Sequence, residues 1–62
     1  MKDFRARIEK LLTEAAECDL IARLTTDISK RELFERLACD YREMAQDVEK
    51  IAAIREQGQP ED

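Results

Sequence analysis

The chain has 62 residues, of which 42% are charged and 5% aromatic, with a formal net charge of −4, two cysteines and no histidine. A chain of this length forms at most one domain, and its own core is only marginally large enough for stability. The negative charge argues against a protein dominated by binding to nucleic acid or anionic membranes, and the lack of histidine removes the commonest general base and metal ligand.

The first predicted element is an α-helix over about residues 3–24. Its apolar residues recur every three or four positions, which keeps them on one side of a helix. This first stripe consists of Phe4, Ile8, Leu11, Ala15, Cys18 and Ala22. Leu12 and Ala16 widen it, whereas Leu20, Ile21 and Leu24 leave it near the end of the helix. The carboxylate of Asp3 is the expected cap of the first turn.

A short polar break follows, and two residues compete to start the next helix. Asp27 can cap a helix that begins at Ile28. Alternatively, Ser29 can cap a helix that begins at Lys30, with Glu32 completing a Ser-x-x-Glu capping box. We favour the earlier start at Ile28.

The second predicted element is an α-helix over about residues 28–57, and it carries the second apolar stripe. This stripe consists of Phe34, Leu37, Tyr41, Met44, Val48 and Ile51. The alanines Ala38, Ala45 and Ala52 are expected to flank it. Gly58 suits the left-handed residue that closes a helix, so residues 1–57 form one predicted hairpin domain and residues 58–62 an acidic tail.

Together the two stripes predict an all-α, antiparallel helical hairpin. Small residues of the first helix oppose large residues of the second, which favours close packing. The combined apolar face is wider than one partner helix can cover, so we expect self-association into a four-helix bundle. The predicted interface residues are Phe4, Ile8, Leu11, Leu12, Phe34, Leu37, Tyr41, Met44, Val48 and Ile51.

Residues 15–45 also carry a pattern seen in a known group of proteins. The matching segments are Glu17-Cys18-Asp19-Leu20-Ile21-Ala22, Thr26-Asp27, Arg31-Glu32, Leu37-Ala38 and Tyr41-Arg42-Glu43-Met44-Ala45. The pattern resembles that of the small uncharacterised helical-hairpin proteins common in alphaproteobacteria, although Ile28 stands where that group usually has proline. The resemblance implies a hairpin fold and no established activity. In length and shape the chain is also similar to Rop-like RNA-binding regulators, by architecture alone.

Individual polar residues suggest structural roles rather than chemistry. Cys18 lies on the first stripe and Cys39 nearly opposite the second, so a disulfide between them is not expected. Asp19 is expected to pair with Arg23 four residues later. The basic residues Lys30, Arg31, Arg36 and Arg42 are interleaved with acidic ones, which is typical of a solvated helix face. We expect no catalytic residue, metal site or cofactor.

The sequence therefore predicts a non-enzymatic, self-associating helical-hairpin protein that acts as an interaction or adaptor module. Its expected partners are a second copy of the chain or a helix of another protein. The alternative is a Rop-like regulator that binds structured RNA as a dimeric four-helix bundle. No apolar run is long enough to span a bilayer, and we expect a cytoplasmic location without membrane contact.

Overall fold

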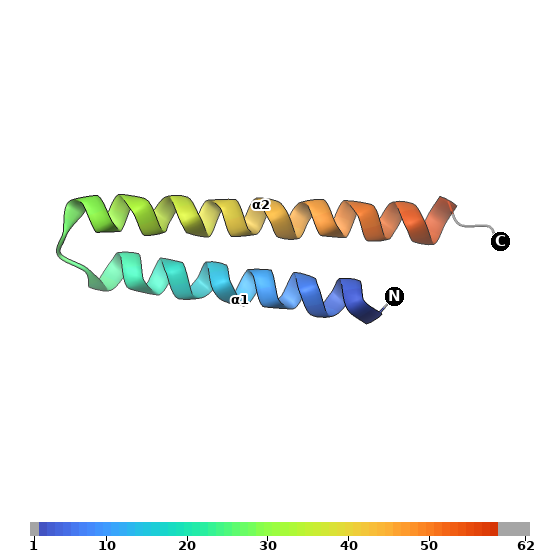
Figure 1. Cartoon of the computed structure of the whole chain (residues 1–62), viewed down its shortest axis with the longest axis horizontal. Helices are drawn as coiled ribbons and strands as arrows, with labels where there is room; N and C mark the ends of the chain where they lie inside the picture. Colours follow the sequence, from blue (N-terminus) through green and yellow to red (C-terminus); the bar gives the residue numbers. More distant parts are fainter. Residues whose placement is uncertain (1, 59–62) are drawn as a thin grey trace.

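The computed structural model of the chain is a hairpin of two antiparallel α-helices (Figure 1). It describes residues 2–58, and side chains over residues 4–55. Helix α1 spans Lys2–Leu24 and helix α2 spans Ile28–Gly58. The predicted all-α hairpin is confirmed, with helix bounds within one residue of those expected. Gly58 lies inside α2 and Asp3 inside α1. The side chain of Asp3, which was the predicted cap, and tail residues 59–62 fall outside what is described.

The connection between the helices is fixed by Asp27. The Oδ1 atom of Asp27 accepts a hydrogen bond from the Lys30 amide at 3.2 Å, and its carbonyl accepts the first intrahelical bond, from the Arg31 amide, at 2.9 Å. The Asp27 amide in turn donates to Oγ1 of Thr25 at 3.2 Å. These are the contacts of an N-cap residue, so α2 begins at Ile28 and the alternative cap at Ser29 is wrong.

The cap gives the first testable prediction. We expect Asp27→Ala to lower the free energy of unfolding by about 1 kcal/mol, because the amide of Lys30 loses its acceptor. Asp27→Asn keeps a side-chain oxygen at the same place and should stay close to the wild type. Urea titration followed by far-ultraviolet circular dichroism measures both, and an Asp27→Ala variant as stable as the wild type would show that the cap contributes nothing.

Small residues form the seam between α1 and α2. Among residues 4–55, the buried apolar side chains are Ala15, Cys18, Ala22, Ala38 and Ala45. Ala15, Cys18 and Ala38 form one cluster, against which Phe34, Leu37 and Tyr41 pack from α2. Because the distance between helix axes depends on the side chains at the contact, these small residues allow a close approach.

The seam corrects the predicted rotation of α2. Ala38 and Ala45, expected to flank the apolar stripe, are only 0% and 2% exposed, whereas the stripe residues Met44 and Ile51 are 43% and 49% exposed. Helix α2 is therefore turned so that its alanines face α1. The large residues next to them are left half-covered along one side of the hairpin.

The outer faces of both helices are charged. Exposed acidic and basic residues occur there together, as do Arg5 and Glu9 on α1 and Glu43 and Lys50 on α2. Within residues 2–58, neither helix combines the length and the apolar character needed to cross a membrane.

Candidate interaction surface

The side of the hairpin that exposes large residues is here called the apolar flank, and it is defined by Ile21, Leu33, Leu37, Met44 and Ile51. At about 100° per residue, its four α2 members lie within roughly 40° of one another around the helix. They stand about a third of a turn from the seam alanines. Leu33 is 54% exposed, and Ile21 from α1 is 41% exposed. The flank is an apolar strip that α1 leaves uncovered.

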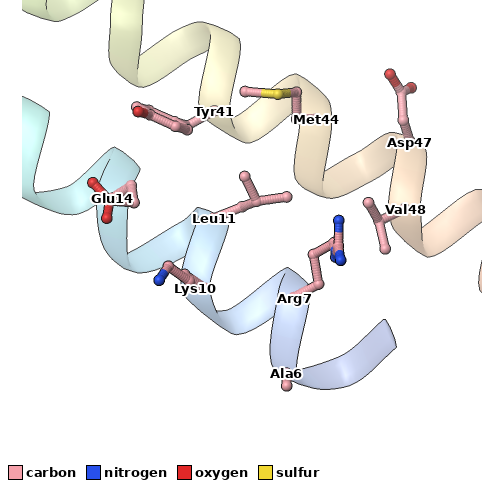
Figure 2. Close-up of a pocket in the computed structure, with 9 residues that line it drawn as sticks. All are labelled: Ala6, Arg7, Lys10, Leu11, Glu14, Tyr41, Met44, Asp47 and Val48. Carbon is pink, nitrogen blue, oxygen red and sulfur yellow. The ribbon is translucent and has the colours of Figure 1, made fainter. Parts of the chain in front are cut away.

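An open groove of about 820 Å³ lies between the helices at the part of this flank that Met44 occupies (Figure 2). Figure 2 shows Leu11 of α1 facing Met44 of α2, with the ring of Tyr41 beside them. The groove is lined by Ala6, Arg7, Lys10, Leu11, Glu14, Tyr41, Met44, Asp47 and Val48. Its floor is apolar and its rim carries charges of both signs. Such a groove can bind an apolar side chain of a partner on its floor, while a charged residue next to that side chain pairs with the rim.

The opposite side of the hairpin carries an ion pair that joins the helices. There Asp19 forms an ion pair with Arg42 across the two helices. The prediction of a pair with Arg23 is therefore wrong: the partner comes from α2. Arg23 lies next to Asp19 in a shallow hollow that Ala22 and Glu35 complete. Because both charged groups of the pair are nearly half-exposed, the pair orients the helices more than it stabilises them.

Two of the four basic residues singled out in the sequence make contacts inside the hairpin. Arg42 pairs with Asp19, and Nη2 of Arg31 donates to the Thr25 carbonyl at 3.1 Å. Lys30 and Arg36 are exposed. Binding of structured RNA by the helix surface that carries these basic residues stays a prediction.

The two cysteines are both free thiols in different surroundings, as expected. Cys18 is buried in the seam and Cys39 is exposed. Burial raises the pKa of the Cys18 thiol, and the nearby carboxylates of Glu14, Asp19 and Glu17 raise it further. Because the folded state holds Cys18 in its neutral form, this residue adds stability at neutral pH. That contribution is lost as the pH rises from about 8.5 through the raised pKa.

This difference predicts a large gap in thiol reactivity. At pH 8, Cys39 should react with a disulfide reagent at the rate of a free thiol, whereas Cys18 should react at least about 100-fold more slowly, because only opening of the seam exposes its sulfur. Stopped-flow absorbance gives the two phases. Cys39→Ser should remove the fast phase alone, and a single fast phase of two thiols in the wild type would contradict the buried position of Cys18.

The structure divides the ten predicted interface residues into two groups. Seven are half-buried, namely Phe4, Ile8, Leu11, Phe34, Leu37, Tyr41 and Val48, and three are exposed, namely Leu12, Met44 and Ile51. Sequence reasoning left Leu33 and Ile21 out of this set. The spacing of Leu33, Leu37, Met44 and Ile51, by four, seven and seven residues, is the signal that identifies the flank.

One further contact joins the open ends of the helices. The guanidinium carbon of Arg55 lies over the ring of Phe4, 5.8 Å from its centroid. This cation–π geometry covers one face of the ring.

The hairpin is compatible with the resemblance noted in the sequence, at the level of the fold. Comparisons of the chain with protein-family models, with curated proteins and with solved structures return no match.

Proposed function

We propose that the protein is a non-enzymatic, self-associating helical hairpin that acts as a small interaction module. The observation that carries this proposal is the apolar flank. Its residues Leu33, Met44 and Ile51 stay about half-exposed while alanines occupy the seam. A contiguous apolar strip with a charged rim is typical of a surface that binds another protein.

The small size of the seam supports the same conclusion. Among residues 4–55 no large apolar side chain is fully buried. Burial of a large side chain contributes about 1.5–3 kcal/mol, and the seam obtains only a fraction of this from alanines. Covering the apolar flank supplies the missing burial. Association and folding are therefore expected to stabilise each other.

In this function, one copy lays its apolar flank on the flank of another, or on an amphipathic helix of a partner protein. The exposed charges beside the strip then set the orientation, while the apolar residues supply the affinity. The coarse architecture of the assembly is a four-helix bundle, in which each hairpin contributes two neighbouring helices.

Sedimentation equilibrium between about 1 and 100 µM tests the proposal. We expect a dimer or larger species whose fraction rises with concentration, together with a helix signal that rises in parallel. A folded hairpin that stays monomeric throughout this range would refute self-association. Met44→Gln serves as the matched variant, since it keeps the side-chain length and removes apolar surface from the flank.

A further inference from the structure

We infer that two copies associate through the apolar flank in an antiparallel arrangement, with one twofold axis that crosses the flank perpendicular to the helices, level with position 12 of α1 and about position 42 of α2. This inference rests on the proposed function and specifies its interface. The supporting observations are the order of charges on α1, the order of apolar residues on α2, and the register of the hairpin.

The first observation is the order of charges along the α1 edge of the flank. Arg7, Lys10 and Glu14 line the groove, and Glu17 continues the same edge one turn later. Two basic residues are thus followed by two acidic ones. A second copy running in the opposite direction brings Arg7 against its Glu17, and Lys10 against its Glu14. Both pairings are centred on position 12, so a single shift satisfies four pairs in the dimer.

The second observation is the order of apolar residues on α2. An antiparallel copy of α2 centred on position 42 brings Leu33 against Ile51 of the second copy. With this shift, Leu37 and Val48 of the second copy lie within one residue of the same level on the inner edge of the strip. On the outer edge, Arg36 and Asp47 of the second copy also lie within one residue of the same level. Self-complementary pairs of this kind are what an isologous interface requires.

The third observation is that the register of the hairpin joins these two centres. Leu11 faces Met44, and Arg7 points toward Val48 (Figure 2). Position 12 of α1 is therefore level with about position 43 of α2, within one residue of the α2 centre at position 42. A single twofold axis passes through both centres, although the charge pattern and the apolar pattern lie on different helices.

The opposite orientation, with both turns at one end, gives a poorer interface. It lays the charged edge of α1 on the apolar strip of the second copy. Glu14 is then level with Tyr41 and loses water without gaining a basic partner, which is costly. In the antiparallel arrangement these charges face opposite charges at the rim, and the apolar residues of α2 meet each other.

Charge reversal on α1 tests the choice of flank. One variant carries Arg7→Glu with Lys10→Glu, and a second carries Glu14→Lys with Glu17→Lys. Each alone makes the edge carry a single sign, so we expect the dimer dissociation constant to rise at least about tenfold. An equimolar mixture of the two restores every opposite pairing, and we expect a heterodimer with affinity within about threefold of the wild type.

Matched controls carry the same charge changes away from the flank. They are Arg5→Glu with Lys50→Glu, and Glu9→Lys with Glu49→Lys, all at exposed positions. Circular dichroism verifies that every variant stays helical. If the wild type dimerises and the flank variants behave like these controls, the inferred flank is wrong while the proposed function stands. If the wild type is a monomer, the proposed function itself fails.

A distance measurement tests the orientation. Thr26→Cys in a Cys39→Ser background places one accessible thiol in the turn, since Cys18 is buried. Each turn lies about 14 residues from the inferred axis, so spin labels in the two turns should be roughly 40 Å apart at 1.5 Å per residue. Turns at the same end of the bundle would instead give less than about 20 Å, and this result would overturn the antiparallel arrangement.

Discussion

Ala38→Leu is expected to unfold the hairpin or force its helices apart. Ala38 is 0% exposed and packs with Ala15 and Cys18 in the seam between the two helices. A leucine there has no room unless α2 moves away, and overpacking of this kind costs about 1–3 kcal/mol. In a chain with so small a seam, this is a large share of the total stability. Thermal and urea denaturation, followed by circular dichroism, measures the loss.

Ala53→Leu is the matched control for this substitution. Ala53 is exposed on the same helix, and leucine has nearly the helix propensity of alanine. We therefore expect a change of less than about 0.5 kcal/mol. If Ala38→Leu proved as stable as Ala53→Leu, the two helices would not meet through the seam, and the observed rotation of α2 would be incorrect.

Leu37→Asp is the second substitution with a large expected effect. Leu37 is half-buried against the seam cluster and also belongs to the apolar flank. The change removes an apolar side chain and leaves a carboxylate without a partner among apolar neighbours. We expect a loss of about 3 kcal/mol in the free energy of unfolding, together with loss of any dimer.

Glu49→Lys provides the comparison, because Glu49 is exposed. Reversal of a solvated charge there should change stability by less than about 0.5 kcal/mol. Leu37→Asn separates the lost apolar surface from the added charge. Similar stabilities of Leu37→Asp and Glu49→Lys would show that Leu37 does not face the seam.

The course of the backbone was predictable because short-range rules govern it. Asp27 is a strong cap followed by a helix-compatible segment, so local hydrogen bonding alone places the start of α2 at Ile28. The 3-4 spacing of Phe34, Leu37 and Tyr41 fixes the side of α2 that turns inward to within a fraction of a turn.

The fine rotation of α2 was not predictable by ranking residues on hydrophobicity. That ranking favours Met44 and Ile51 over Ala38 and Ala45. When a helix packs against only one neighbour, however, the volume of the side chains at the contact limits how closely the two helices approach. The face that carries the small alanines therefore turns toward α1. The partner of Asp19 was missed for a related reason. A sequence shows which residues lie four apart on one helix, whereas Arg42 reaches Asp19 only through the pairing of two helices.

The seam of small residues constrains how the sequence can drift over evolutionary time. At Ala15, Ala38 and Ala45 the limit is on bulk, so glycine, serine or cysteine can replace alanine with modest loss, while larger apolar residues cannot. At Leu33, Met44 and Ile51 the requirement is hydrophobicity, so any large aliphatic residue can maintain the apolar flank. Related chains should therefore exchange one small residue for another at the seam positions, and one large aliphatic residue for another at the flank positions.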